Sequence, residues 1–300
     1  MTQVRVTDPR TVASTGDRLK AYLELTKPRI IELLLITTVP AMVVAAGGWP
    51  STGLVLATLV GGTLSAAGAN TINQVLDGDI DRVMPRTRHR PLPTGRIDPG
   101  HALAFGVTLG LLGFAWLWAT TNLLAALLST VGLLFYVLVY TAYLKRSSIQ
   151  NIVIGGGAGA VPPLVGWAAV TDTLALPAWT MFAIVFFWTP PHFWALSLRY
   201  RQDYAAAAVP MLPVVVGVGA TLEHIVRYSV LVVGVSLLPY GVGALGVLYL
   251  VVVAILGVAL VTAALRLRRQ PTEAMRFFGW TNLYLAGVFL AMAADVLLRT

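Results

Sequence analysis

The 300-residue sequence contains no cysteine, which excludes disulfide bonds, thiolate nucleophiles and cysteine-ligated metal sites. Charge is also scarce, because Asp, Glu, Lys and Arg together make up only 11% of the residues, whereas soluble domains contain about 25%. The hydrophobic share is 57%, so the chain must be an integral membrane protein. The net charge of +8 follows membrane topology, and no nucleic-acid partner is expected.

Nine apolar runs are long enough to cross a bilayer at roughly 20 residues per helix, and they predict an all-α protein with nine transmembrane helices. Residues 1–19 are polar without periodicity and predict a disordered cytoplasmic tail. Residues 20–29 are typical of a short amphipathic helix that Pro28 ends, and we expect residues 20–300 to form one transmembrane domain. The nine runs lie near residues 30–47, 53–76, 99–119, 123–143, 150–170, 177–198, 222–242, 245–265 and 277–297.

The basic residues follow the topology that nine spans impose. If the N-terminus is cytoplasmic, Arg299 is the one of the 21 Lys and Arg residues that falls on the outer side, and Arg227 lies in the first turns of a span that starts on the inner side. The outer loops are short and carry no base. The positive-inside rule therefore predicts a cytoplasmic N-terminus and favours an odd number of spans.

The segment 70–96 is the most polar part of the chain. Within it, Asn73, Asp77 and Asp81 recur at i, i+4 and i+8, so a helix places them on one face, and Asp79 points elsewhere. Three oxygen ligands on one face suit Mg²⁺, which usually shares its coordination shell with substrate phosphates. A solvated loop explains Asp79 well, but it explains the aligned three poorly, because carboxylates near a helix C-terminus oppose its dipole.

Basic side chains accompany this acidic segment. Arg86 and Arg90 lie just downstream, and Lys145 and Arg146 lie in the loop two spans later. Guanidinium groups bind phosphate in bidentate fashion, so these four residues predict a diphosphate-binding set beside the magnesium site. An ordinary basic inner loop explains Lys145 and Arg146 about equally well.

A second polar cluster begins inside the sixth span. His192 lies there beside Pro190 and Pro191, which we expect to break the helix. A lone histidine either bonds a neighbouring carbonyl or has a functional role, and an ionisable group at membrane depth favours function. Asp203 ends the same helix and is a second candidate carboxylate. The glycine-rich run 155–159 is no P-loop. It either lets helices approach closely or leaves room for a flat ligand.

The block NQVLDGDID, followed by RTRHRPL, resembles the intramembrane UbiA-type prenyltransferase superfamily. Further strings are similar to its family of protohaem IX farnesyltransferases, and they span most of the chain in order. They are YLELTKPR (22–29), RTRHRPLPTG (86–95), YTAYLKRSSIQNIVIGGGAGAVPPLVGW (140–167), PPHFWALSLRYRQDY (190–204) and VPMLP (209–213).

This resemblance implies nine helices around a central cavity near the cytoplasmic face of the plasma membrane. The implied reaction transfers a farnesyl group from farnesyl diphosphate to a vinyl group of haem B, with addition of water, and gives haem O and diphosphate. Asn73, Asp77 and Asp81 then bind diphosphate through Mg²⁺. The superfamily's second motif is typically DxxxD, but here only Asp203 is present and Arg199 stands four residues earlier. We expect Arg199 to bind diphosphate, and the number of Mg²⁺ ions stays open.

The resemblance leaves His192 with three roles: binding the water that traps the new cation, accepting its proton, or ligating the haem iron. It also implies the downstream haem A synthase as a partner. A prenyltransferase acting on a quinone precursor or chlorophyllide shares the aspartate motif, but the string PPHFWA argues against it. A transporter has polar groups at mid-depth and repeated halves, whereas the polar groups here crowd at the inner side.

Overall fold

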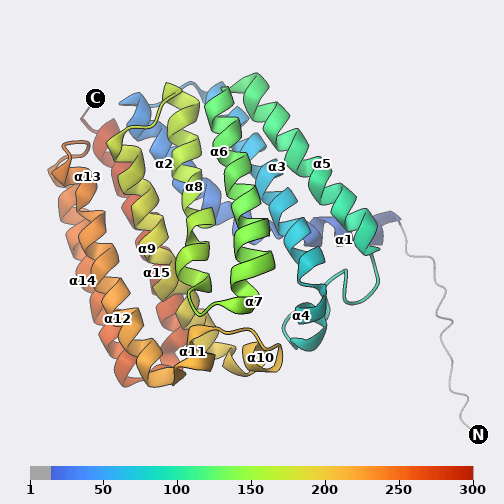
Figure 1. Cartoon of the computed structure of the whole chain (residues 1–300). Coiled ribbons are helices and arrows are strands. Elements are labelled where there is room, and N and C mark those ends of the chain that lie inside the picture. The colour runs from blue at the N-terminus through green and yellow to red at the C-terminus, as the bar shows by residue number, and fades with distance from the viewer. Residues whose placement is uncertain (1–14, 300) are drawn as a thin grey trace, which may run out of the picture.

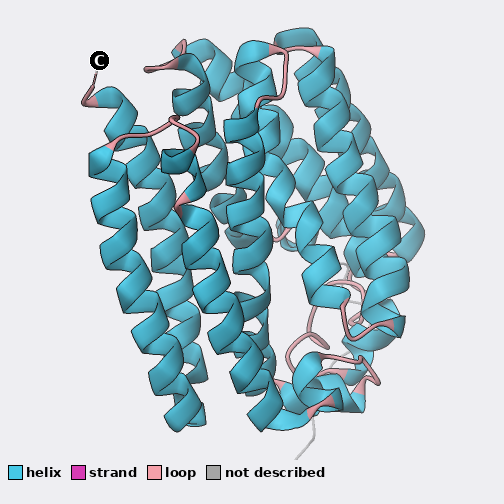
Figure 2. Cartoon of the chain, turned by 60° about the vertical axis from the view of Figure 1, so that its left-hand side comes forward, coloured by secondary structure: helices cyan, strands magenta, loops and turns pink. Residues whose placement is uncertain are grey.

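The computed structural model describes residues 15–299 and gives only the backbone of residues 29–30 and 32–35. Every regular element in this part of the chain is a helix, and it contains no strand. The long helices run side by side, with most loop segments at their ends (Figure 1 and Figure 2). They are α2 (Pro28–Ala46), α3 (Thr52–Leu76), α5 (Pro99–Thr120), α6 (Leu123–Leu134), α8 (Asn151–Thr171), α9 (Leu176–Arg199), α12 (Gly217–Ser236), α14 (Val247–Arg269) and α15 (Ala274–Leu297).

Shorter elements complete the bundle. α6 continues through the π-helix η1 (Phe135–Leu144) into α7 (Lys145–Ser147). At the lower end of Figure 1 lie α4 (Gly78–Val83), α7, α10 (Arg201–Ala206) and α11 (Leu212–Val215). We call this the basic end, because it holds the loop arginines and the lysine of α7. The remaining short elements are α1 (Thr15–Thr26), α13 (Leu238–Gly241) and the 3₁₀ turn η2 (Pro271–Glu273).

Among the described residues, eight helical segments are long and apolar enough to cross a membrane. The chain is therefore an all-α, multi-pass integral membrane protein, as its composition predicts. α2 is a further helix of 19 residues, but its apolar part with described side chains, Ile36–Ala46, is shorter than a span. The ninth span and the cytoplasmic N-terminus stay predictions. The eight segments are Thr52–Leu76, Pro99–Thr120, Leu123–Ser147, Asn151–Thr171, Leu176–Arg199, Gly217–Gly241, Val247–Arg269 and Pro271–Leu297.

The N-terminal helix α1 starts earlier than the sequence predicts. Part of the expected tail, residues 1–14, lies outside the described residues, whereas residues 15–19 are helical and not a tail. The helix is held by Ala21 and Leu25, which are buried against the start of α5 and the loop before it. This contact stabilises α1 although its first turn is polar and solvated. Because that first turn has no hydrophobic periodicity, the sequence does not indicate that it is helical.

Glycines allow the close helix contacts on which the site depends. A Cβ atom on Gly68 of α3 would lie 2.7 Å from the backbone oxygen of Gly106 on α5, so these two helices pack backbone to backbone. In α8, a Cβ on Gly155 would overlap the ring of Tyr140, and a Cβ on Gly156 would lie 3.0 Å from Thr189. Close packing therefore explains the start of the 155–159 run. Gly159, by contrast, has nothing within 4 Å of its Cβ position.

Candidate active site

The acidic motif lies where α3 ends. Asp77 follows the last residue of α3 with φ −86° and ψ 7°, and α4 starts at the next residue. The backbone N–H groups of Asp77 and Asp81 still bond the carbonyls four residues earlier, at 2.9 and 2.8 Å. The helical spacing therefore persists across the break. Asn73, Asp77 and Asp81 are buried together at 1–2% exposure, whereas the side chain of Asp79 is 65% exposed.

Each of the three buried side chains is held by a cation from a different segment. Lys27 Nζ donates to Asn73 Oδ1 at 2.6 Å, and Lys145 Nζ lies 2.6 Å from Asp77 Oδ2. The guanidinium of Arg90 donates to both carboxylate oxygens of Asp81, at 3.0 and 2.8 Å. Ligand oxygens and cations thus form three pairs that share one buried site.

Hydrogen bonds fix the orientation of Asn73. Its amide Nδ2 donates to Asp77 Oδ2 and to Thr141 Oγ1, both at 2.9 Å. The hydroxyl of Thr141 in turn donates to the carbonyl of Tyr136, five residues earlier in the π-helix, at 2.8 Å. Both amide protons are used in this way, so Oδ1 is the atom of Asn73 that accepts the hydrogen bond from Lys27.

The residues present fit a divalent metal ion. Asp77 Oδ1 is buried and has no hydrogen-bond partner, an arrangement that is costly unless a cation occupies it. The donor set consists of two carboxylates and one amide oxygen, the hard ligands that Mg²⁺ prefers. No group of three His, Cys, Asp or Glu residues with metal-binding geometry occurs in the described part of the chain, and a three-ligand set here would take Asn73 as its third member.

Lys27 is the member of the site that sequence reasoning missed. The sequence shows it only as one more basic residue on the inner side, although it belongs to the string YLELTKPR. The amides of Asn70 and Gln74 on α3 donate to carbonyls in the last turn of α1, at 2.9–3.2 Å. They thereby hold the turn in which Lys27 adopts a positive φ of 53°. Burial, and after it the charge of Arg90, lowers the pKa of Lys27 to about 7.

Arg86 lies against the end of α9. Its guanidinium carbon lies 5.1 Å from the ring centroid of Tyr200, a cation–π distance. Its Nε is buried without a hydrogen-bond partner, so this donor is free to bind an anion. Burial also raises the pKa of Tyr204, the tyrosine of α10 that Arg86 meets.

Three other candidates lie apart from the buried motif. Arg146 donates to both oxygens of Asp79 at 2.7 Å and to the carbonyl of Leu76 at 2.6 Å. The Arg146 guanidinium holds the pKa of Asp79 well below its usual range. Arg199 is exposed and faces the loop between α14 and α15. Asp203 is half-buried in α10, and its carboxylate makes no ion pair with a described residue. Among the described residues, no hydrogen bond or ion pair joins Arg146, Arg199 or Asp203 to Asn73, Asp77 or Asp81.

His192 lies in the middle of a continuous helix, which corrects one prediction. α9 passes through Pro190 and Pro191 without a break, because neighbouring helices stabilise the turn that the prolines weaken. The imidazole is 6% exposed and is stacked between Trp188 and Phe278, each at 4.2 Å between ring centroids. Its Nδ1 lies 2.8 Å from Thr281 Oγ1. The hydrogen-bond partner of His192 is thus the Thr281 side chain of α15. It is not the neighbouring backbone carbonyl that a purely structural histidine was expected to bond.

The comparisons with known proteins agree with this fold. Residues 34–291 match the model of the UbiA prenyltransferase family, and the chain belongs to that family. It is therefore a prenyltransferase enzyme of the membrane-embedded class.

The names of its relatives specify one activity within this family. The chain is 55% identical to Protoheme IX farnesyltransferase of Symbiobacterium thermophilum over 286 residues, which cover 94% of this chain and 96% of the relative. It is 51% identical over 282 residues to a Protoheme IX farnesyltransferase of Thermus thermophilus, a match that covers 93% of this chain and 46% of that longer relative.

Solved structures show the same fold. A digeranylgeranylglyceryl phosphate synthase has a TM-score of 0.76 at 22% identity, with 93% of this chain and 99% of that chain covered. A UbiA homologue from Archaeoglobus fulgidus, bound to DMAPP and Mg²⁺, has a TM-score of 0.64 at 17% identity, with 91% and 99% covered. At these identities the likeness supports the fold alone.

Proposed function

We propose that this protein transfers the farnesyl group of farnesyl diphosphate to a vinyl group of haem B, with addition of water, to form haem O. The observation that carries the proposal is the 55% identity, over nearly the whole of both chains, with a protein named Protoheme IX farnesyltransferase. The buried pairing of three oxygen ligands with three cations is what a site for a metal-bound diphosphate requires.

The diphosphate end of the reaction belongs to the acidic motif. Asn73, Asp77 and Asp81 would hold Mg²⁺, which supplies positive charge to the departing diphosphate. The bond between the first farnesyl carbon and the diphosphate oxygen breaks, and its electron pair leaves with diphosphate. Because charge develops on that oxygen, cations already in place stabilise the transition state without reorganisation.

The cations of the site have a second task. Lys145 and Arg90 neutralise the carboxylates of Asp77 and Asp81 before substrate arrives, and Lys27 donates to the neutral amide of Asn73, each within 3.0 Å. With those oxygens engaged by a metal ion, the same three side chains would be available to bind the phosphate oxygens. Arg86 adds the donor that is buried without a partner.

The acceptor end belongs to His192. The farnesyl cation forms a carbon–carbon bond with the vinyl group, and water oxygen then bonds to the new cation while its proton leaves to a base. His192 lies seven residues before Arg199, the last residue of α9 at the basic end, which is roughly 10 Å along a helix. It is therefore deeper than a diphosphate held at the basic end, and it lies at a depth suited to a porphyrin. Trp188 and Phe278 around it exclude bulk water, which would quench the cation.

The location follows from the position of the acidic motif at the basic end. We expect this end to face the cytoplasm from the plasma membrane, in line with the positive-inside rule. Haem O is apolar and stays in the bilayer, so a haem A synthase in the same membrane is the partner expected to receive it.

The test is a product assay with the purified full-length protein in detergent. Haem B, farnesyl diphosphate and Mg²⁺ should give a haem product whose mass has increased by one farnesyl group and one hydroxyl group, and excess chelator should prevent it. Parallel incubation with 4-hydroxybenzoate examines the quinone alternative. Prenylated 4-hydroxybenzoate without any haem product would overturn the proposal.

A further inference from the structure

The hydroxyl of Thr281 determines which nitrogen of His192 carries the proton. Thr281 Oγ1 lies 2.7 Å from the carbonyl oxygen of Phe278 and 2.8 Å from His192 Nδ1. A hydroxyl has one hydrogen, and a carbonyl oxygen can only accept. The 2.7 Å contact between two oxygens needs that hydrogen between them, since their lone pairs repel without it. Nδ1 must therefore donate to Thr281, which leaves the lone pair of the neutral ring on Nε2.

The surroundings allow the ring of His192 little freedom to leave this arrangement. Trp188 and Phe278 cover its two faces, with interplanar angles of 21° and 27°. Trp188 Nε1 donates to the backbone oxygen of Thr281 at 2.7 Å, and Thr281 itself is fully buried. One residue of α15 thus accepts hydrogen bonds from two side chains of α9. Only the ring edge that carries Nε2 is left for a ligand.

We propose that Thr281 is a positioning residue that holds His192 in the Nδ1–H form and presents the Nε2 lone pair to the acceptor substrate. This inference rests on the proposed function, in which His192 faces haem B. It assigns all three roles of His192 to one atom, because the Nε2 lone pair can accept a hydrogen bond from water, accept a proton or ligate iron, and cannot donate a proton.

The test compares Thr281→Val, which removes the hydroxyl and keeps the shape, with Thr281→Ser, which keeps the hydroxyl. The ¹⁵N NMR signals of His192 report the tautomer, and the variant His192→Gln identifies them among the four histidines of the chain. The full-length protein and Thr281→Ser should show Nδ1–H, whereas Thr281→Val should lose this preference. The absorption spectrum of added haem B should then change in Thr281→Val and be restored in Thr281→Ser.

Two outcomes would overturn the proposal, and they have different consequences for the proposed function. If His192 carries its proton on Nε2 in the unaltered protein, the tautomer assignment is wrong while haem farnesylation can still stand. If Thr281→Val changes the tautomer but leaves the haem spectrum and turnover unchanged, Thr281 does not position a working histidine. In that case the acceptor role of His192 in the proposed function fails as well.

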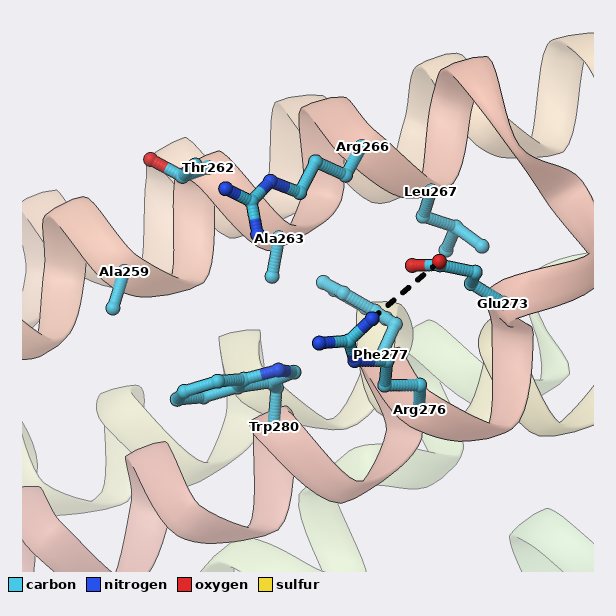
Figure 3. A pocket seen from close by; sticks show the side chains of 9 residues that line it. All are labelled: Ala259, Thr262, Ala263, Arg266, Leu267, Glu273, Arg276, Phe277 and Trp280. Atoms are coloured by element: carbon cyan, nitrogen blue, oxygen red, sulfur yellow. Dashed lines mark ion pairs between the residues drawn. The ribbon is translucent and has the colours of Figure 1, made fainter.

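A separate observation concerns a groove between α14 and α15 at the basic end (Figure 3). It encloses about 240 Å³, and none of the candidate site residues lines it. Ala259, Ala263 and Phe277 form its apolar wall, and Trp280 lies along one side, as Trp often does at a membrane interface. The groove therefore opens where lipid headgroups meet the acyl region.

The charges of this groove are not balanced by the protein. Arg276 lies 3.5 Å from Glu273 in an exposed ion pair, whereas Arg266 makes no ion pair with any described residue. Two arginines against one glutamate leave one positive charge. In Figure 3 the guanidinium of Arg266 extends back along α14 towards Thr262, as helix side chains tilt, and so lies over the apolar wall. An anionic headgroup at that position would pair with this charge.

We further infer that this groove binds the phosphodiester of an anionic phospholipid, with an acyl chain along Ala259 and Ala263. Basic pockets between transmembrane helices on the inner side have this preference. The test uses the full-length protein in nanodiscs of equal parts phosphatidylcholine and phosphatidylglycerol. Native mass spectrometry then counts the phosphatidylglycerol that stays bound.

Arg266→Gln and Arg276→Gln should each retain phosphatidylglycerol about fivefold less well. Arg269→Gln removes a neighbouring charge from the same helix end outside the groove and should behave like the unaltered protein. Equal loss in Arg269→Gln would show general surface attraction and overturn the inference. Displacement of the lipid by millimolar inorganic phosphate would identify a free-anion site and would also overturn it.

Discussion

Lys145 and Asp77 form a buried ion pair, with Nζ 2.6 Å from Oδ2, at a carboxylate whose other oxygen has no partner. The lysine thus occupies half of a carboxylate that the proposed function gives to Mg²⁺. Metal alone must compete with the lysine, and diphosphate that draws the lysine away without metal leaves the charge of Asp77 uncompensated. We therefore expect metal and diphosphate to bind with strong mutual dependence.

Lys145→Met should change the two affinities in opposite directions. Removing the competing charge should raise the affinity for Mn²⁺ alone by about tenfold, since roughly 1 kcal/mol or more of repulsion disappears. The affinity for farnesyl diphosphate in the presence of metal should fall by a similar factor. Electron paramagnetic resonance of free Mn²⁺ and calorimetric titration of a farnesyl diphosphate analogue measure the two. A fall in both affinities would contradict the competition.

The three aspartates of the acidic segment should differ sharply. Asp77→Asn and Asp81→Asn remove buried charges of the ligand set and should lower kcat/KM by about 100-fold or more. Asp79→Asn only breaks an exposed pair with Arg146 and should cost at most about fivefold. Steady-state farnesylation of haem B, with folding checked by circular dichroism, gives the comparison. An equal loss in all three variants would show that burial does not separate their roles.

His192→Ala and Asp77→Ala should impair opposite ends of the reaction. His192→Ala should weaken haem binding or farnesylation and leave the affinity for farnesyl diphosphate nearly unchanged. Asp77→Ala should do the reverse, because the carboxylate belongs to the diphosphate end. Titrating each substrate into each variant separates the two effects. If His192→Ala keeps haem binding but loses farnesyl diphosphate, the depth difference between the two groups has been misjudged.

The pKa of Lys27 predicts how stability depends on pH. Its folded-state pKa is about 7, well below the ordinary 10.5, so between these values the unfolded chain binds a proton that the folded chain does not. Folding stability must then rise with pH across this window. Thermal unfolding of the substrate-free protein at about pH 7 and about pH 10 should show this rise, and Lys27→Met should show a smaller one. Identical slopes would assign the pH dependence to other groups.

Topology can be examined with reporter fusions after Gly95 and Thr300. Nine spans place the loop after α4 in the cytoplasm and the C-terminus outside, so the two reporters should give opposite signals. Seven of the apolar segments lie between the two reporters, from Pro99–Thr120 to Pro271–Leu297. Signals from the same side would mean that one of these seven does not cross the membrane.

The sequence predicts the helices of this fold well because hydrophobic runs of span length have one stable form in lipid. It also predicts the buried set Asn73, Asp77 and Asp81, since helical spacing alone places them together. Two kinds of residue were harder to read. Lys27 was indistinguishable from other inner-side bases, because its role depends on how α1 packs against α3. Arg146 has a guanidinium group suited to phosphate, yet in the structure it donates to Asp79 and to the last carbonyl of α3.

Thr281 shows a further limit of sequence reasoning. A threonine within an apolar helix usually bonds its own backbone, and Thr281 does so through Phe278. Nothing in its neighbourhood along the chain indicates that the same oxygen also meets His192, 89 positions away. That role exists only once α9 and α15 are packed.

The π-helix η1 makes this enzyme sensitive to the length of one segment. Lys145 N–H bonds the carbonyl of Tyr140, five residues earlier, so the segment holds one residue more than an α-helix of the same rise needs. Deleting one residue between Thr141 and Lys145 would still leave a helix that spans the membrane. It would also shorten the spacing of these two residues from four positions to three, which on a helix changes the direction of Lys145 relative to Thr141 by about 100°. Deletions here should therefore yield well-folded proteins without a working diphosphate site, a failure that measurements of expression and stability would not detect.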